Sequence, residues 1–164
     1  MNKDYLIHES TALKGCSDGQ MQLKNAITAN ELVKTFYDRI DFCLANNFPS
    51  NEFLVANSEL IKECGIVVDQ KQLLSNPDKL VLLGSCDVEV IFTEYIVSRI
   101  YVKHSSLITI KASGNAFVMV DALDQSRVIA ECTENARVVV NLYSNATSIG
   151  ATKTIHKNRE TYEL

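Results

Sequence analysis

The chain of 164 residues has no tryptophan, only two prolines and six glycines, and its apolar runs, such as LVLL at 80–83, are short. A membrane-spanning helix needs about 20 consecutive apolar residues, so we expect no membrane span and no membrane partner. The opening segment MNKDYLIHES carries charged residues and no apolar stretch follows it. We therefore expect no secretory signal either.

The five cysteines form no CxxC pair, and their number is odd. This pattern is typical of free thiols in a reducing compartment rather than of a disulfide framework. The three histidines stand at no zinc-ligand spacing from the cysteines. The sequence therefore predicts neither a metal nor any other cofactor.

Side chains that could carry catalysis form no recognisable set. The glycines are scattered, which argues against a phosphate-binding loop. Cys86 and Cys132 are expected to be small core residues, and His104 an exposed turn residue. The acidic pairs of two successive rows are expected on solvated outer faces rather than in a cation site: Asp121 and Asp124, then Glu131 and Glu134. The sequence thus predicts a protein that is not an enzyme.

The charge balance bears on the class of partner. A net charge of −4 argues against nucleic acid, because affinity for a phosphate backbone comes from clustered Lys and Arg. A small basic cluster stands near the C-terminal end and consists of Lys153, His156, Lys157 and Arg159. It is too small to change that expectation.

The first 65 residues show the 3.6-residue periodicity of helices. Three helices are expected, at residues 17–27, 30–46 and 50–65. Ser17, Asn30 and Ser50 are their candidate N-caps. The turn signal SNPD at 75–78 predicts the end of a helical N-terminal region that spans residues 1–74.

From Ser85 onward the chain repeats every ten residues. The rows that begin at Asn115, Gln125 and Asn135 read NAFVMVDALD, QSRVIAECTE and NARVVVNLYS. Over seven rows, columns 2, 4, 6 and 8 hold small to medium, mostly apolar residues, whereas columns 9, 10 and 1 hold residues that favour turns. Each row is thus expected to form one short strand whose even columns face inward, followed by a turn.

Stacking of such rows predicts the fold class α+β, with a small helical region followed by a repetitive β-region. Residues 75–154 are expected to form a short β-solenoid with ten-residue repeats and one coil per two rows. Residues 155–164 would then be a polar C-terminal tail or cap. An antiparallel β-meander is the alternative, although the small residues in column 2 and the residues of modest size in columns 4 and 6 favour the thin interior of a solenoid.

The rows of the form NA-x-V-x-V resemble the decapeptide-repeat, β-solenoid-like proteins of gut Bacteroidota, other bacteria and their phages. The resemblance covers roughly residues 85–151, and the segment FYDRIDFCLANNFPSNEFL is similar to the helical leader of such proteins. It implies an architecture and no catalytic residues. The last row departs from the pattern, with Ser148 and Gly150 in inward columns.

Large apolar side chains in outward columns are the candidate interface. These residues are Phe117, Met119, Ile129, Val139 and Ile149. If two rows make one coil, Met119 and Val139 lie on one side of the solenoid, and Ile129 and Ile149 lie on the other. Contiguous exposed apolar surface usually marks an interface.

The predicted function is therefore that of a non-enzymatic structural or protein-interaction protein, associated with a phage or another mobile element, whose β-repeat stacks or oligomerises. Its partner would be a second copy of the chain or another protein. The alternative is a small regulatory or anti-defence binder that docks on a host protein through the solenoid surface. The expected location is the cytoplasm, or the virion if a phage encodes the protein.

Overall fold

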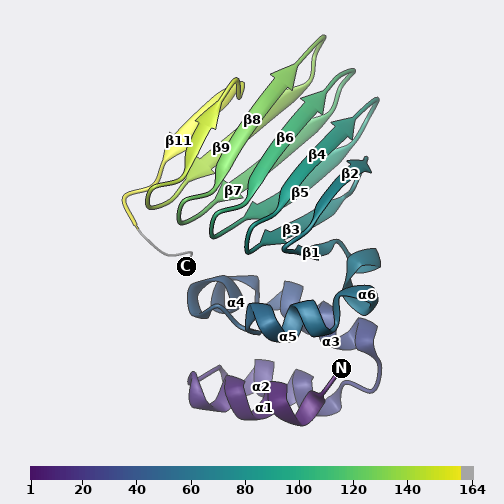
Figure 1. The fold of residues 1–164 in the computed structure, drawn as a ribbon, viewed down its shortest axis with the longest axis vertical. Helices are drawn as coiled ribbons and strands as arrows, with labels where there is room; N and C mark the ends of the chain where they lie inside the picture. The colour runs from purple at the N-terminus through teal and green to yellow at the C-terminus, as the bar shows by residue number, and fades with distance from the viewer. Residues whose placement is uncertain (160–164) are drawn as a thin grey trace. The chain divides into compact units, whose positions relative to one another are not determined.

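A computed structural model of the protein describes residues 1–159 (Figure 1). Residues 1–64 form one compact unit, which is helical, and residues 65–159 form a second unit, which is built of strands. The strand unit is a β-solenoid of about four coils, so the expected α+β fold class and the solenoid closure are confirmed. Parallel strand pairing excludes the antiparallel meander.

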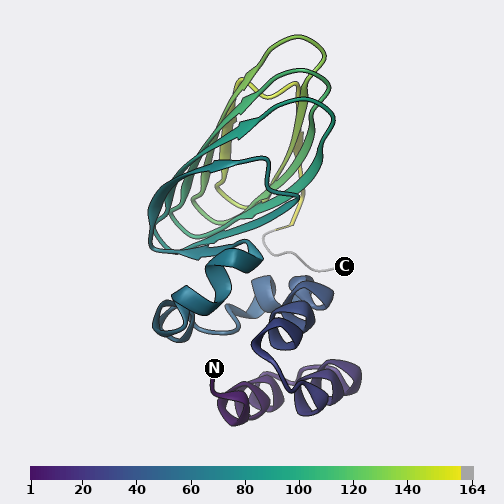
Figure 2. The same ribbon diagram turned by 90° about the vertical axis from the view of Figure 1, so that its right-hand side faces the viewer.

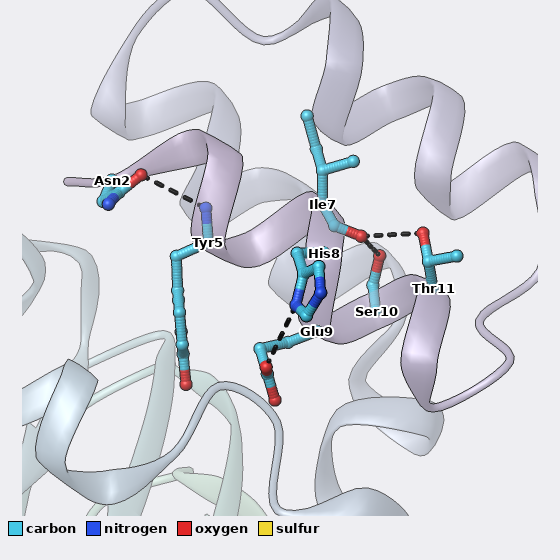
Figure 3. Close-up of polar contacts among 7 residues, drawn as sticks. All are labelled: Asn2, Tyr5, Ile7, His8, Glu9, Ser10 and Thr11. Atoms are coloured by element: carbon cyan, nitrogen blue, oxygen red, sulfur yellow. Dashed lines mark hydrogen bonds and ion pairs between the residues drawn. The ribbon is translucent and has the colours of Figure 1, made fainter.

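The helical unit contains six helices and a short 3₁₀ segment. They are α1 (Lys3–Ala12), α2 (Ser17–Asn25), α3 (Ala29–Asp38), α4 (Ile40–Asn46), α5 (Asn51–Ala56), α6 (Ser58–Ile61) and η1 (Lys62–Cys64). Helix α1 begins at an N-cap formed by Asn2, whose Oδ1 accepts a hydrogen bond from the Tyr5 amide at 3.2 Å (Figure 3). Near its end, the Ser10 and Thr11 hydroxyls both donate to the Ile7 carbonyl.

Two of the expected helices are interrupted. The helix expected over 30–46 is divided into α3 and α4 at Arg39, which has φ −125° and ψ 33°. The helix expected after Ser50 is divided at Asn57, whose side-chain amide donates to the Phe53 carbonyl at 2.7 Å. Short polar side chains compete in this way with the backbone hydrogen bonds of a helix. The apolar periodicity continues across both breaks and therefore does not reveal them.

The helix N-caps agree with the sequence at one position of three. Ser50 caps α5, and its hydroxyl accepts from the Phe53 amide at 3.3 Å. Helix α3 begins earlier than expected because Thr28, not Asn30, forms a capping box with Glu31. Cys16, not Ser17, is the N-cap of α2.

Within the described part of the chain, the solenoid has eleven strands in two parallel sheets. They are β1 (Ile66–Val68), β2 (Lys71–Ser75), β3 (Lys79–Leu83), β4 (Asp87–Phe92), β5 (Val97–Val102), β6 (Leu107–Ala112), β7 (Phe117–Ala122), β8 (Arg127–Cys132), β9 (Arg137–Leu142), β10 (Thr147–Ile149) and β11 (Lys153–His156). Sheet A has the order β1-β3-β5-β7-β9-β11, and sheet B has the order β10-β8-β6-β4-β2. Successive strands of the chain alternate between the sheets, so one coil takes two rows, as expected. Figure 2 shows the coils as flattened loops whose long sides are the sheets.

The boundary between the two units lies between residues 64 and 65, ten residues before the boundary that we expected. Strands β1 and β2 belong to the first coil, because β1 pairs with β3 and β2 pairs with β4. In that coil Ile66 pairs with Val81, fifteen residues on, whereas in later coils Asp87 pairs with Leu107, twenty residues on. The shorter coil does not follow the ten-residue rows, which is why the sequence pattern misses it.

The core lies between the two sheets and is filled by the even columns. In column 6 the side chains of Val90, Ile100, Ile110, Val120 and Val140 are each 0 % exposed. Small residues in column 2, such as Ala116 at 1 % and Ser126 at 0 %, let the chain turn close to this core. The inward assignment of the even columns is therefore confirmed for the complete coils.

The turns share one backbone conformation. Column 10 has positive φ in every complete row, through Gly84, Glu94, His104, Gly114, Asp124, Glu134 and Ser144. Along the stack, a side chain of one turn accepts a hydrogen bond from the amide of the turn twenty residues earlier. The Gly84 amide donates to His104 Nδ1 at 2.9 Å, the His104 amide to Asp124 at 3.2 Å, and the Gly114 amide to Glu134 at 2.8 Å. The corners thus hold neighbouring coils together outside the sheets.

The last coil is shorter than the others and passes over the end of the core. Lys153 pairs with Val139, fourteen residues earlier. At Gly150, with φ +78°, the backbone passes so close to β8 that a Cβ atom would lie 2.0 Å from the Ala130 carbonyl oxygen. Next along the chain, Thr152 Oγ1 accepts from the Val138 amide of β9 at 3.1 Å. Residues 150–152 therefore connect sheet B to sheet A across the end of the core, which is how the departure of the last row from the repeat is accommodated.

The described residues include only the first part of the predicted tail at 155–164. Residues 155 and 156 belong to β11, and residues 157–159 follow it. The remaining residues of the predicted tail, 160–164, lie outside the described residues.

Candidate interaction faces of the solenoid

The five residues expected at an interface lie on two different faces. Phe117, Met119 and Val139 point outward from sheet A, whereas Ile129 and Ile149 point outward from sheet B. Met119 pairs with Val139, and Ile129 pairs with Ile149, in agreement with the expected division between two sides. Ile149 is 67 % exposed, and the other four are partly buried. Their role in binding stays a prediction.

Four neighbouring side chains form what we call the apolar patch of sheet A: Val97, Phe117, Met119 and Val139. Val97 pairs with Phe117 across β5 and β7, and Met119 pairs with Val139 across β7 and β9. Val97 is 74 % exposed. Because paired residues of adjacent strands lie about 5 Å apart, the four side chains make one continuous apolar surface.

Basic residues lie on both sides of this apolar patch along the order of the strands, and we call them the basic border: Lys79, Arg99, Arg137 and Lys153. Arg137 pairs with Phe117, Lys153 with Val139, and Arg99 with Met119. All four are exposed. Columns 3 and 5 of sheet A contain no acidic residue, so this part of the face is positively charged although the chain as a whole is negative.

Beside the apolar patch, column 7 of sheet A holds a buried polar cluster around Asp121. This residue is 1 % exposed, which corrects the expectation that it lies on a solvated face. Its carboxylate accepts from Asn141 Nδ2 at 2.9 Å, from Arg99 Nη2 at 3.3 Å and from the Tyr143 hydroxyl at 3.5 Å. The Arg99 guanidinium also lies 5.2 Å from the centre of the Tyr101 ring. Asp121 therefore fixes the position of one member of the basic border.

His104 is a structural residue of a corner rather than an exposed turn residue. It is partly buried, and its Nδ1 accepts the Gly84 amide, so this nitrogen must carry no proton. Burial lowers the pKa of His104, as does the charge of the adjacent Lys103, whereas the carboxylates of Asp124 and Asp69 act in the opposite direction. Burial also lowers the pKa of Lys103, against the attraction of Asp124 3.8 Å away.

We predict that acid weakens the solenoid through His104. The pKa of this ring is lowered in the folded chain, whereas a histidine in the unfolded chain titrates near pH 6.5, about its ordinary value. The unfolded state therefore binds more protons in that range, and the free energy of unfolding falls as the pH drops below about 6.5 and through the lowered folded pKa. Urea unfolding followed at a series of pH values from neutral to mildly acidic measures this slope.

The matched variants are His104→Asn and His156→Asn. Asparagine at position 104 tolerates positive φ and keeps an acceptor without the titration, so the slope should become flatter. His156, in β11, is exposed, and its replacement should leave the slope unchanged. An unchanged slope in His104→Asn would contradict the assignment.

The outer face of sheet B carries charges of both signs. Ion pairs join Lys71 to Asp87 at 2.6 Å and Lys111 to Glu89 at 2.9 Å. Exposed apolar side chains stand at both ends of its column 5, with Leu73 at 64 % and Ile149 at 67 %. Sheet B thus carries charges of both signs, whereas columns 3 and 5 of sheet A carry only positive charges.

The cysteines and the possible metal-ligating side chains were candidates for a disulfide or a metal site. All five cysteines are free, and Cys43 and Cys86 are buried, the latter as expected. Cys132 is only partly buried. Among residues 1–159, no group of three or more His, Cys, Asp or Glu side chains is placed to hold a metal ion. No helix in the same part of the chain is long and apolar enough to cross a membrane.

The fold defines the class to which the chain belongs as a short parallel β-solenoid preceded by a helical unit. In comparisons with protein-family models, curated proteins and solved structures, the chain matches none of them.

Sequence reasoning missed the polar cluster around Asp121 and the basic border. A signal was present once rows are compared at a spacing of twenty rather than ten. At that spacing, column 7 of sheet A holds Tyr101, Asp121 and Asn141, whereas column 7 of sheet B holds Ile91, Lys111 and Glu131. The outer faces of sheets A and B are therefore chemically different, and an alignment in rows of ten residues puts residues of both faces into the same column.

Proposed function

We propose that this chain is a non-enzymatic protein-interaction protein whose solenoid presents rigid faces to a second copy of the chain or to another protein. The observation that carries the proposal is the exposure of large apolar side chains on both sheets, with Leu73, Val97 and Ile149 each more than 60 % exposed. Stacked parallel strands hold these side chains at fixed spacing, so binding requires little ordering of the protein. The free cysteines support a reducing compartment such as the cytoplasm.

Sheet B is the face that we assign to self-association. Its charges of both signs, such as Glu89 and Lys111 or Asp87 and Lys71, allow a symmetric contact to place opposite charges together. A symmetric contact through sheet A would bring the basic borders of two copies against each other. The adjacent pair Ile129 and Ile149 supplies the apolar contact on sheet B.

Size-exclusion chromatography with light scattering tests this assignment. We expect the wild-type chain to form an oligomer and Ile129→Glu to be a monomer with an unchanged circular dichroism spectrum, because a charge would be buried in the contact. The matched variant Met119→Glu, in the same column on sheet A, should remain an oligomer. A strictly monomeric wild type would reject self-association, and an unfolded Ile129→Glu would mean that Ile129 is a core residue.

The second candidate function is that of a small regulatory or anti-defence binder, encoded by a phage or another mobile element, that docks on a host protein. The apolar patch of sheet A with its basic border favours this role, since a surface of one charge suits a partner of different composition. The genes adjacent to the one that encodes this chain test which of these two roles applies. Adjacent capsid or tail genes would support a virion component, and adjacent defence-related genes would support the binder.

A further inference from the structure

The outer face of sheet A has two properties that together specify a partner. The apolar patch of Val97, Phe117, Met119 and Val139 offers a surface for aliphatic or aromatic side chains, and the basic border offers cations at both ends of it. Arg137 lies beside Phe117, and Lys153 lies beside Val139. Along column 5, Lys79 and Arg99 precede Met119 and Val139, and Lys153 follows them. The apolar side chains therefore lie in the middle of the face, with cations on both sides of them, at the spacing of neighbouring strands, about 5 Å.

We propose that this face binds an extended acidic segment of a partner protein, in which carboxylate side chains flank a short group of aliphatic or aromatic ones. This inference rests on the second candidate function, docking on another protein, and names its surface and the chemistry of the partner. In an extended segment, side chains on one face recur about every 7 Å. Apolar side chains at the centre of that face can therefore contact the apolar patch, while carboxylates before and after them on the same face reach the border.

Two other occupants fit the face less well. A nucleic acid would use only the cations and would leave the four side chains of the apolar patch without a partner. Specific nucleic-acid sites bring together many more Lys and Arg residues and are salt-dependent in proportion. A second copy of the chain in a symmetric contact would place Arg137 and Lys153 near their own counterparts, and like charges repel.

One member of the basic border, Arg99, is already held in position before a partner binds. Its guanidinium is held between the Asp121 carboxylate and the Tyr101 ring, yet its side chain remains 49 % exposed. A guanidinium that is already oriented loses less side-chain entropy when a carboxylate binds. Asp121 thus acts as a positioning residue for the proposed contact, without touching the partner.

The probe for the test is a fluorescein-labelled synthetic peptide of roughly ten residues, long enough to cross several strands, in which a centre of leucine and phenylalanine is flanked by glutamates on both sides. Fluorescence anisotropy measures its binding to the full-length chain at about 0.01 M salt, where charges act over about 30 Å, and at about 1 M, where they act over about 3 Å. We expect saturable binding that weakens at high salt. A peptide with lysine in place of each glutamate should not bind.

Matched variants assign the binding to sheet A. Arg137→Glu and Met119→Glu should each weaken binding about tenfold, which corresponds to about 1.4 kcal/mol. Their counterparts at the same columns of sheet B, Arg127→Glu and Ile129→Glu, should change it less than about twofold. Circular dichroism confirms that each variant is folded.

The proposal is overturned if the wild-type chain does not bind the glutamate peptide, or if the lysine peptide binds equally well. It is also overturned if the sheet B variants weaken binding as much as the sheet A variants, or if a single-stranded oligonucleotide competes with the peptide at lower concentration. The outcomes separate this proposal from self-association. A monomeric chain that binds the peptide rejects the sheet B oligomer alone, and an oligomer that does not bind it rejects the sheet A site alone.

Discussion

Ile110→Ala is expected to lower the free energy of unfolding of the solenoid by about 3 kcal/mol. Ile110 lies in β6, in the inward column 6, and is 0 % exposed. Its side chain fills the narrow space between the two sheets, where Val90 and Ala130 pair with it from the neighbouring strands. Removing three carbons there leaves a cavity that a stack of hydrogen-bonded coils cannot easily close, so the cost includes lost burial and lost packing.

The matched control for this prediction is Ile129→Ala. Ile129 has the same side chain on the same sheet but points outward and is only partly buried. We expect its replacement to cost about 1 kcal/mol or less. Urea denaturation followed by circular dichroism measures both values. Equal losses in the two variants would contradict the assignment of inward and outward columns.

Gly150→Ala is expected to detach the last coil, with a local loss of about 2 kcal/mol. The backbone at Gly150 has φ +78°, which L side chains adopt only under strain, and a Cβ atom there would lie 2.0 Å from the Ala130 carbonyl oxygen. The chain must therefore move away from β8, and the crossing to β11 moves with it. Because each coil of a solenoid contacts only its neighbours, we expect the remaining coils to stay folded.

Trypsin cleavage measures this local opening, because Lys153 lies in β11 and becomes a substrate when β11 leaves β9. Gly19→Ala in α2 is the control. Its Cβ atom would lie no closer than 3.4 Å to another atom, and Gly19 does not have positive φ. Cleavage at Lys153 that is as slow in Gly150→Ala as in Gly19→Ala would show that the last coil tolerates a side chain there.

The alternation of apolar residues was sufficient to predict the interior of the solenoid. Inward columns need narrow apolar side chains wherever two sheets pack closely, so Val118, Val120 and Val140 are recognisable in the sequence and are 0 % exposed. The same reasoning separated Met119 and Val139 from Ile129 and Ile149, because a coil of two rows directs alternate rows to opposite faces.

Features that depend on other contacts could not be read from this alternation. A period of two distinguishes the two sides of a strand but does not report what packs on the outer side, so the burial of Asp121 and Lys103 was not foreseen. Strands β1 and β2 were assigned to the helical region because the turn signal at 75–78 lies within the first coil and not before it. The helix breaks at Arg39 and Asn57 arise from local backbone geometry, to which an apolar periodicity is insensitive.

The pairing of each turn with the one twenty residues away has a consequence for how such a chain can change its length. Removing ten residues would send every later strand to the opposite sheet, so the two outer faces would be exchanged from that point on. The turns that follow sheet A, such as the one at His104, would then stack on turns that follow sheet B, such as the one at Glu134. Removing twenty residues would take out one coil and leave each face and each corner continuous. Genetic insertions and deletions in the repeat are therefore compatible with the fold in whole coils, and the faces lengthen or shorten together.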